Sequence, residues 1–335
     1  MSSGYHIAVI GIGAMGSLFA GRLSGIRQTG DDGDQTSNIK VTMIGSWREQ
    51  IDAIRNNGLQ VIHPDGHTST HRPNIAEKED VIDPADFALV LVKSHQTAAA
   101  ADTVKNFLKN DGLAITLQNG LGNDYILSVI LGEDQVAQGV IMQGASMHAP
   151  GIVRQAGNGK IYLGEKGPLR SKLVLLSDIF EAAGLSTTIT ARTDEIIWRK
   201  LSINAAVNPV TALLEIKNGE ILTDPFAMSV AVAASREIAE LAVARGILFS
   251  GNVKDHLIHT CRTSAENRSS MLQDIRRGVR TEIDAINGAA LKIALKMKFA
   301  MPVNQMLYAM VKQKEVLGTV QLKPLQALMK QLNRN

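Results

Sequence analysis

Short apolar runs alternate with helical patterns along the first half of the chain. The runs are rich in Val, Ile and Leu, which is typical of parallel strands covered on both faces. Segments with helical spacing lie between them, and this alternation predicts a doubly wound α/β domain with a parallel sheet. The expected strands are residues 7–10, 39–44, 87–92, 113–117 and 136–142, and the expected helices are residues 17–23, 49–56 and 98–109.

The pattern changes after about residue 190. Glycine becomes rarer, strand-like runs disappear and long helical patterns follow one another, so we expect an all-helical second domain. The predicted domains are residues 1–190 and residues 191–335, with a polar surface insertion at residues 28–37. The expected helices of the second domain are residues 194–214, 229–244, a segment from residue 252 onward, 269–291 and 306–316.

Composition narrows the class of protein. Of the 335 residues, 45% are hydrophobic and 20% are charged, and Cys261 is the single cysteine. One cysteine cannot form an internal disulfide or hold a zinc ion alone, so we predict a cytoplasmic protein with no metal site. A net charge of only +3 and 4% aromatic residues argue against nucleic-acid binding. The longest uncharged stretch, residues 135–153, is too polar to span a membrane.

A glycine-rich motif, Gly-Ile-Gly-Ala-Met-Gly at residues 11–16, follows the first expected strand and opens the first expected helix. Gly11 would allow the tight turn, Gly13 would let the backbone approach a pyrophosphate, and Gly16 would let helix and strand pack closely. The alternative is a tight turn without a ligand. The register of strand, motif and helix favours a Rossmann-type domain that binds a dinucleotide.

The residues after the second expected strand bear on which dinucleotide binds. Proteins that read NAD place an acid there for the ribose 2′-hydroxyl. Asp32 and Asp34 have about the expected spacing from the glycine motif, but they precede the strand and are rejected. Ser46 and Arg48 follow the strand and suit a 2′-phosphate, so we predict NADP rather than NAD. The alternative is that Arg48 is a solvated residue of the next helix.

Two further strands are followed by polar residues. Lys93 follows the apolar run 87–92, and Asn119 lies two positions after the run 113–117. Ligands of doubly wound sheets bind outside the carboxyl ends of the strands. Lys93 would meet a phosphate or a carboxylate, and Asn119 would orient a ribose or a substrate oxygen. An ordinary loop role is an equal alternative for each residue.

A polar stripe runs along an otherwise apolar helix. Lys200, Asn204 and Asn208 are spaced four residues apart, which places them on one helix face. A lysine buried beside two carboxamides needs partners or a polar ligand. The pattern favours a functional stripe over a structural hydrogen-bond network. Pro209 follows at once and is expected to bend the helix.

The expected helix 269–291 offers a second set of candidates. Ser270 and Asp274 share a face, and Glu282 lies further along, past Gly278. A carboxylate near Lys200 would shift the pKa of the lysine and hold it in place. Most helical glutamates are simply solvated, so the alternative is that Glu282 is a solvent-exposed residue with no functional role.

Taken together, these motifs resemble the ketopantoate reductases (2-dehydropantoate 2-reductases). The resemblance covers nearly the whole chain, and its most specific blocks lie in the second half. The matching blocks are Gly11–Gly16, Lys93, Gln118–Gly120, Trp198–Leu201, Asn204, Asn208–Pro209, Asn218–Glu220, Ser269–Asp274, Thr281–Asp284 and Asn287–Gly288.

The resemblance implies an NADPH-dependent reduction of ketopantoate to (R)-pantoate in pantothenate biosynthesis, with no metal. Lys200 would be the general acid and Glu282 would lie near it and near the cofactor. The implied substrate-binding residues are Asn119, Asn204, Asn208, Asn218 and Ser270. The implied cofactor-binding residues are Gly11, Ile12, Gly13, Ala14, Met15, Gly16, Ser46, Arg48, Lys93, Asn119 and Glu282.

Two other functions remain open at this point. One is a reductase of similar build that acts on another 2-oxo acid or an imine. The other is a protein that senses NADP without catalysis. This function would not explain the position of Lys200 in an apolar helix. A small-molecule substrate is expected in the first case. An exposed helix of the second domain could pair two chains into a homodimer, although the sequence selects none.

Overall fold

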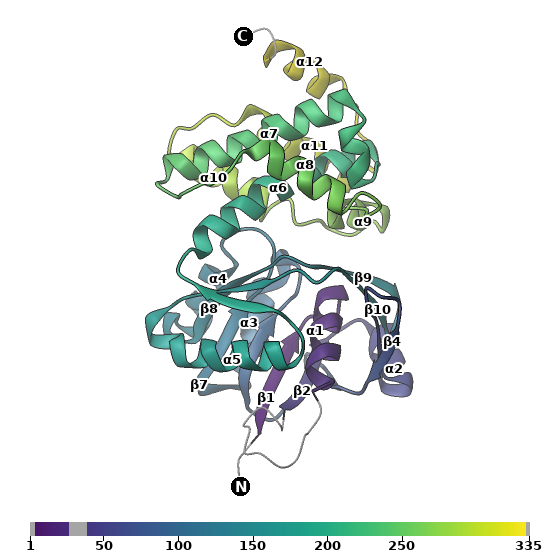
Figure 1. Cartoon of the computed structure of the whole chain (residues 1–335), viewed down its shortest axis with the longest axis vertical. Helices are drawn as coiled ribbons and strands as arrows, with labels where there is room; N and C mark the ends of the chain where they lie inside the picture. Colours follow the sequence, from purple (N-terminus) through teal and green to yellow (C-terminus); the bar gives the residue numbers. More distant parts are fainter. Residues whose placement is uncertain (1–3, 27–38, 333–335) are drawn as a thin grey trace. The chain divides into compact units, whose positions relative to one another are not determined.

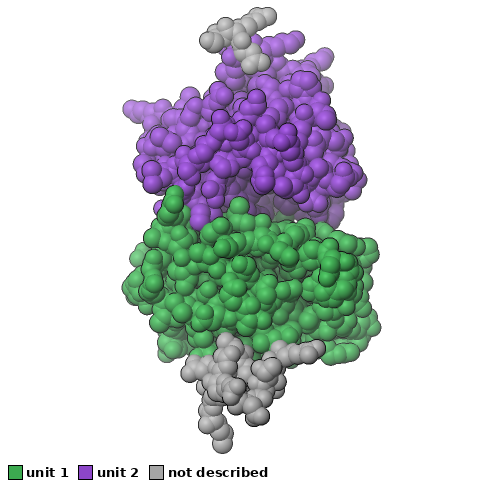
Figure 2. Space-filling view, viewed as in Figure 1, with its two compact units in different colours: residues 1–118, 123–193 green, residues 119–122, 194–335 purple. Residues whose placement is uncertain are grey.

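The computed structural model describes residues 4–26 and 39–332. The chain forms two compact units, residues 1–118 with 123–193 and residues 119–122 with 194–335 (Figure 2). The division at residues 193 and 194 lies close to the boundary expected at residue 190. The short segment 119–122 belongs with the second unit. The insertion expected at residues 28–37, with Asp32 and Asp34, lies outside the described residues.

The first unit contains an eight-stranded sheet with the order β12-β11-β8-β7-β6-β1-β2-β5 (Figure 1). Neighbouring strands are parallel except β8 and β11, which are antiparallel. The sheet confirms the doubly wound α/β prediction. Its strands are β1 (Tyr5–Ile10), β2 (Ile39–Gly45), β5 (Asn74–Glu77), β6 (Ala85–Val90), β7 (Leu108–Thr116), β8 (Val136–Ile141), β11 (Ile161–Gly164) and β12 (Thr187–Thr190).

Helices cover both faces of this sheet. They are α1 (Ala14–Ser24), α2 (Arg48–Asn57), α3 (Thr97–Lys105), α4 (Asn123–Leu131) and α5 (Arg170–Ala182), with 3-10 helices η2 (Ser94–Gln96), η3 (Glu133–Gln135) and η4 (Gly167–Leu169). Successive side chains of a strand point to opposite faces. Ile7 and Val9 therefore pack with α1 and α5, whereas Ala8 and Ile10 pack with α3 and α4.

A second sheet, with the order β4-β3-β10-β9, packs against α1. Its strands are β3 (Leu59–Ile62), β4 (Thr68–His71), β9 (Gly144–Ala149) and β10 (Ile152–Ala156). Val61 and Val153 are fully buried in the core beneath it. The apolar pattern did not predict this sheet, because β4 is Thr-Ser-Thr-His and β9 is Gly-Ala-Ser-Met-His-Ala, and neither has a run of large apolar side chains.

The described part of the second unit is helical, as predicted. Several helix starts have clear caps. Asp224, for example, accepts hydrogen bonds from the backbone N–H groups of Phe226 and Ala227, and Pro225 occupies the first helical position. The helices are α6 (Thr193–Leu214), η5 (Asn218–Leu222), α7 (Pro225–Ala244), α8 (Val253–Thr263), α9 (Ser270–Arg276), α10 (Asn287–Lys296), α11 (Pro302–Leu317) and α12 (Lys323–Leu332).

The single helix expected at residues 269–291 is wrong. Helix α9 ends at Arg276, and residues 277–286 form a loop before α10. Gly278 has a positive φ of 64°, and the N–H of Val279 bonds to the carbonyl of Asp274. This is the hydrogen-bond pattern of a helix terminated by glycine. The break matters because it releases Glu282 from a helix into the loop.

Candidate active site

The glycine motif forms a close turn between β1 and α1. Gly11 has a φ of +110°, a conformation that side chains rarely adopt, and the N–H of Gly11 bonds to the carbonyl of Ile44. A Cβ atom on Gly16 would lie 1.7 Å from the carbonyl oxygen of Gly11. By contrast, a Cβ on Gly13 would meet no atom within 4 Å. Gly11 and Gly16 are thus required by the fold, whereas Gly13 leaves open space.

The open space at Gly13 lies at the N-terminus of α1. Gly13 is the N-cap residue and provides no side-chain cap, and the first turn of α1, which the structure describes completely, contains no acidic residue. The unpaired N–H groups and the helix dipole favour an anion at such a terminus. The residues present therefore fit the diphosphate of a dinucleotide.

The residues predicted to bind the 2′-phosphate of the cofactor lie after the end of β2. Ser46 and Arg48 are exposed, and Arg48 is the first residue of α2. Their hydroxyl and guanidinium groups are chemically suited to a phosphate. Glu49, which is also exposed in this first turn, is the nearest acidic residue along the chain.

The carboxyl ends of β6 and β7 carry a hydrogen-bond network that the sequence did not predict. Gln118 Nε2 donates to the carbonyl of Val92 and to Thr97 Oγ1, both at 2.9 Å. Thr97 Oγ1 lies 3.0 Å from Oδ1 of buried Asn123. Lys93, which is partly buried, is the N-cap residue of η2. The Gln118 network joins the segments that follow β6 and β7, and Lys93 is next to Val92 in the chain.

Helix α6 of the second unit carries the predicted polar stripe. Lys200 and Asn204 have intermediate exposure, and Asn208 is buried. The helix continues through Pro209 to Leu214, with most residues around the stripe buried. Since a proline has no N–H, the carbonyl of Ala205 lacks its usual helical donor, and Asn287 Nδ2 replaces it at 2.9 Å. The helix that presents the stripe is therefore held by a side chain from α10.

The structure lowers the pKa of Lys200. Burial lowers the pKa of its ammonium to about 8, and the negative charge of Glu282 acts in the opposite direction. Glu282 is only 7% exposed. Asn119 Nδ2 lies 3.5 Å from Glu282 Oε2, at the outer limit of a hydrogen bond. The fold thus groups three predicted residues that are distant in sequence.

Asn218, at the start of η5, carries an unsatisfied acceptor. Its Nδ2 donates to Ser264 Oγ at 2.9 Å, and its backbone N–H donates to the carbonyl of Asn267. Its Oδ1 is buried and has no hydrogen-bond partner among the described residues. A buried acceptor without a donor costs free energy. A ligand hydroxyl would satisfy it.

The structure separates the roles of two adjacent serines. Ser270 is exposed at the first position of α9, whereas Ser269 is buried and caps the helix through the N–H of Leu272. Ser269 Oγ also lies 2.7 Å from Thr211 Oγ1 of α6. Asp274, which was expected on the same face as Ser270, is 1% exposed and pairs with Arg277. Ser269 thus joins α9 to α6, and Ser270 stays a predicted substrate residue.

Among the described residues, no three His, Cys, Asp or Glu side chains are arranged to hold a metal ion. In the same part of the chain, every helix is too short or too polar to cross a bilayer.

Comparison with known proteins identifies the family. The family model described as ketopantoate reductase PanE/ApbA matches residues 7–168, and its C-terminal counterpart matches residues 192–315. A 2-dehydropantoate 2-reductase of Halobacterium salinarum is 33% identical over 92% of this chain and 98% of its own length. One from Pyrococcus horikoshii is 34% identical over 93% of this chain and 98% of its own.

Solved structures support the same family and fold. A PanE/ApbA family ketopantoate reductase from Ralstonia eutropha has a TM-score of 0.81 and 26% identity over 92% of this chain and 98% of its own. A D-mandelate dehydrogenase, solved with NADH and anilino(oxo)acetate, has a TM-score of 0.82 and 26% identity over the same shares. This chain therefore belongs to the ketopantoate reductase family of NADP-dependent oxidoreductases.

Proposed function

We propose that this chain reduces 2-dehydropantoate to (R)-pantoate with NADPH, a step of pantothenate biosynthesis, with Lys200 as the proton donor. The observation that carries the proposal is the Lys200 ammonium with a pKa of about 8, on a stripe of carboxamides and under the influence of Glu282. The two archaeal relatives, which bear the name of this enzyme over nearly their whole length, support the choice of substrate.

The chemistry requires an acid near the ketone. When bound, the reduced nicotinamide supplies hydride to the carbonyl carbon, and negative charge develops on the carbonyl oxygen. An ammonium with a pKa of about 8 is mostly protonated at neutral pH and can give up its proton at modest cost. Lys200 would stabilise the charge and transfer the proton to that oxygen. Glu282, with Asn119 against it, would keep the lysine protonated and oriented.

The remaining side chains of the second unit suit the two ends of ketopantoate. The substrate has a carboxylate and a terminal hydroxyl. We assign the carboxamides of Asn204 and Asn208 and the hydroxyl of Ser270 to hydrogen bonds with the substrate. The unsatisfied Oδ1 of Asn218 would accept a hydrogen bond from the substrate hydroxyl, since it is an acceptor only.

The first unit would hold the cofactor. The backbone of residues 11–16 at the N-terminus of α1 would bind the diphosphate, and the open space at Gly13 supports a close approach. Ser46 and Arg48 would bind the 2′-phosphate, and Lys93 would contact the cofactor from the end of β6. We also propose that the enzyme acts in the cytoplasm. We further propose that it forms a homodimer, which light scattering of the purified protein would test.

The D-mandelate dehydrogenase supports a second candidate, the reduction of an aryl 2-oxo acid with NADH. That neighbour was solved with NADH and with anilino(oxo)acetate, which has no aliphatic hydroxyl. In this second case the acceptor of Asn218 would have no donor on the substrate, and Arg48 would have no 2′-phosphate. Asn218 and Arg48 therefore discriminate the two candidates.

The first experiment follows the oxidation of reduced nicotinamide by absorbance. Purified protein is mixed with ketopantoate or benzoylformate, each with NADPH or NADH, and Lys200→Ala is compared with Lys296→Ala, an exposed lysine at the end of α10. We expect fast turnover only with ketopantoate and NADPH, with loss in Lys200→Ala alone. Faster turnover of benzoylformate with NADH would select the second candidate. NADPH binding with no turnover of either acid would overturn both.

A further inference from the structure

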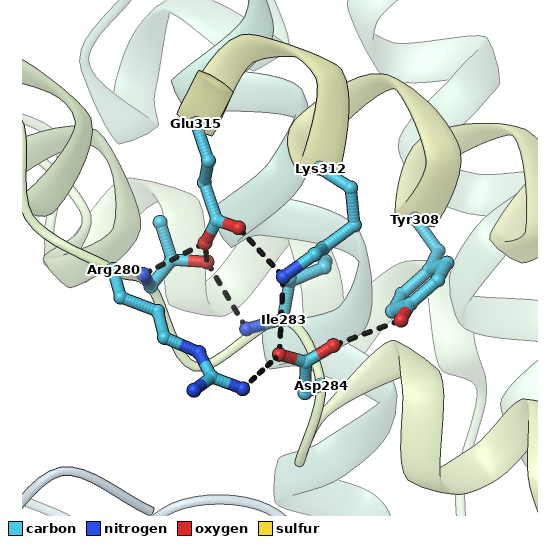
Figure 3. Close-up of polar contacts among 7 residues, drawn as sticks. Arg280, Ile283, Asp284, Tyr308, Lys312 and Glu315 are labelled. Carbon is cyan, nitrogen blue, oxygen red and sulfur yellow. Dashed lines mark hydrogen bonds and ion pairs between the residues drawn. The ribbon is translucent and has the colours of Figure 1, made fainter. Parts of the chain in front are cut away.

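Three side chains on one face of α11 contact the loop that carries Glu282 (Figure 3). Tyr308, Lys312 and Glu315 are spaced four and three residues apart, so they line one side of the helix. We call these three residues the α11 clamp. The loop, residues 277–286, separates α9 from α10. The dashed contacts in Figure 3 join the clamp to loop residues on both sides of position 282.

The first anchor is Thr281, directly before Glu282. Oε1 of Glu315 accepts hydrogen bonds from the Thr281 backbone N–H at 2.8 Å and from its Oγ1 at 2.7 Å. Thr281 Oγ1 in turn accepts from the N–H of Ile283 at 3.2 Å. The Glu315 side chain is only 9% exposed, so water competes little for these bonds. One carboxylate therefore fixes both the backbone and the side chain at position 281.

The second anchor is Asp284, two residues after Glu282. Its Oδ1 accepts from Tyr308 Oη at 2.8 Å, and its Oδ2 lies 3.2 Å from Lys312 Nζ. Arg280 Nη2 donates to the same Oδ2 at 2.9 Å. Lys312 Nζ also lies 2.8 Å from Glu315 Oε2, so this one ammonium joins the two anchors. Loss of Lys312 would loosen both of them.

Position 282 thus lies between two fixed points. The carbonyl of Glu282 also accepts from the N–H groups of Ala285 and Ile286, at 3.1 and 3.0 Å. The backbone around Glu282 is held on both sides, which leaves its buried carboxylate little freedom to turn away. Its carboxylate also lies 3.5 Å from Asn119 Nδ2, at the outer limit of a hydrogen bond.

We propose that Lys312 and Glu315 are positioning residues, which act through Thr281 and Asp284 to hold the Glu282 carboxylate where it acts on Lys200. The catalytic part of this inference rests on the proposed function, in which Lys200 donates the proton. The clamp contacts Thr281 and Asp284 of the loop. Its effect on the reaction would pass through the loop.

The charges of Lys312, Glu315 and their partner Asp284 stay constant in the pH range where Lys200 titrates. Burial alone would raise the pKa of Glu315, but its bonds with Lys312 and Thr281 hold that pKa below its usual value. Burial opposes the charge on Lys312, yet its two acidic partners raise its pKa. Asp284 likewise has a lowered pKa, because its bonds with Arg280, Tyr308 and Lys312 outweigh burial. A change near pH 8 therefore reports on Lys200 and not on the clamp.

The test compares Lys312→Met with Lys312→Arg. The alkaline limb of kcat, which follows the Lys200 ammonium, should move to lower pH by about 0.5 unit in Lys312→Met, because a nearby carboxylate shifts a pKa by about one unit or more. That shift makes kcat at pH 9, taken as a fraction of the neutral plateau, about threefold lower in Lys312→Met than in the unmodified enzyme. Lys312→Arg should restore the original midpoint. Glu282→Gln should give a shift in the same direction that is at least as large.

Two comparisons separate positioning from a general loss of stability. Lys109→Met breaks an ion pair with Asp86 of 2.6 Å in the first unit, at similar exposure, and should leave the midpoint unchanged. In the Glu282→Gln background, Lys312→Met should produce no further shift. An unchanged midpoint in Lys312→Met, or an equal shift in that background, would overturn the proposal, whatever happens to the melting temperature.

A second measurement does not depend on the substrate. Reductive ¹³C-methylation of the lysines gives the pKa of Lys200 by NMR, with its resonance assigned through Lys200→Arg. Lys312→Met should lower this pKa even if ketopantoate proves not to be the substrate. If ketopantoate is not turned over but the NMR shift is present, the proposed function fails and the positioning role stands. If turnover is present and the NMR pKa does not move, the positioning role fails.

Discussion

Lys200 combines a desolvated position with a charge, and this determines how activity depends on pH. Its pKa of about 8 lies below the ordinary lysine value of 10.5, chiefly through burial. A proton donor must be protonated, so kcat for reduction should be constant below about pH 7 and fall as pH rises through about 8. Lys200→Ala should lower kcat by roughly 10²- to 10⁴-fold and abolish this limb. Steady-state kinetics between pH 6 and 10 would check both; a flat profile across pH 8 would contradict the acid role.

Gly13 differs from the other two glycines of its motif because the space beside it is open. A Cβ there meets no protein atom within 4 Å, and its backbone is extended with φ −74°. Gly13→Ala should therefore change the free energy of unfolding by no more than about 1 kcal/mol, because the lower entropy of the unfolded chain offsets the poorer helix cap. The added methyl group would occupy the path of a diphosphate, so the Kd for NADPH should rise tenfold or more.

The matched control is Gly16→Ala, for which the added Cβ would clash with the carbonyl of Gly11 at 1.7 Å. This variant should lose stability as well as NADPH binding. Fluorescence titration and thermal denaturation of both variants would separate the two effects. Unchanged NADPH affinity in Gly13→Ala would show that the phosphates do not lie at this turn.

Arg48 tests the choice between NADPH and NADH. It is exposed at the first position of α2, after β2. A charge-assisted bond to a phosphate contributes about 1.5–3 kcal/mol, so Arg48→Ala should raise the KM for NADPH at least about tenfold and leave that for NADH nearly unchanged. Arg55→Ala, an exposed arginine in the last turn of the same helix, is the control. Equal effects on both cofactors would exclude a role at the 2′-phosphate.

Helix α6 presents the polar stripe only because a gap in its hydrogen bonding is filled from outside. Pro209 leaves the carbonyl of Ala205 without a helical donor, and Asn287 Nδ2 provides one. The same Nδ2 donates to Asn304 Oδ1 at 2.9 Å, and Asn304 is fully buried. Asn287→Ala should therefore lower the unfolding free energy by about 1–3 kcal/mol, measured by urea denaturation, because a buried carbonyl loses its partner.

Pro209→Ala supplies the compensating change, since an alanine N–H can donate to Ala205. The double variant Pro209→Ala with Asn287→Ala should lose less stability than the sum of the two single variants. Such coupling is expected for residues that serve one acceptor. Additive losses would mean that Asn287 stabilises the unit only through its contact with Asn304.

The elements that the sequence predicted best are those whose signal is local. The motif at residues 11–16 and the stripe on α6 each lie within a single strand-turn-helix or helix, so spacing alone places them. The polar strand β4 was missed although its partner β3 is the preceding strand, because Thr-Ser-Thr-His has no apolar residue to mark a buried face. The helix 269–291 was predicted too long because Gly278 was treated as an interruption and not as a terminus.

The parts of the site that escaped prediction depend on contacts across the sequence. Asn287 donates to a carbonyl 82 positions earlier, and its role follows from Pro209 only when both are seen together. Gln118 belonged to a recognised block but received no role, because its partners Val92 and Thr97 come from another strand end. Glu282 was a candidate from the sequence, and the family resemblance gave it a role, whereas the α11 residues that hold its loop were not predicted.

At the scale of the whole molecule, the cofactor motif and the proton donor belong to different compact units. The motif at residues 11–16 lies in the unit of residues 1–118 and 123–193, and Lys200 lies in the other. Each described unit has buried apolar residues of its own. A ligand that binds one unit stabilises it directly, and the other responds only as far as the two are coupled.

Hydrogen exchange would measure this division. NADPH alone should protect the amides of the first turn of α1 and of residues 45–48, while those of α12 should exchange unchanged. At a hundred times its Kd, NADPH should add about 2.7 kcal/mol to the unfolding free energy of the unit that binds it. Adding a 2-oxo acid should extend protection to α6 and η5, since Lys200, Asn208 and Asn218 are the groups proposed to bind it. Uniform protection of both units by NADPH alone would instead mean that they unfold as one cooperative body, so that binding at one unit stabilises both equally.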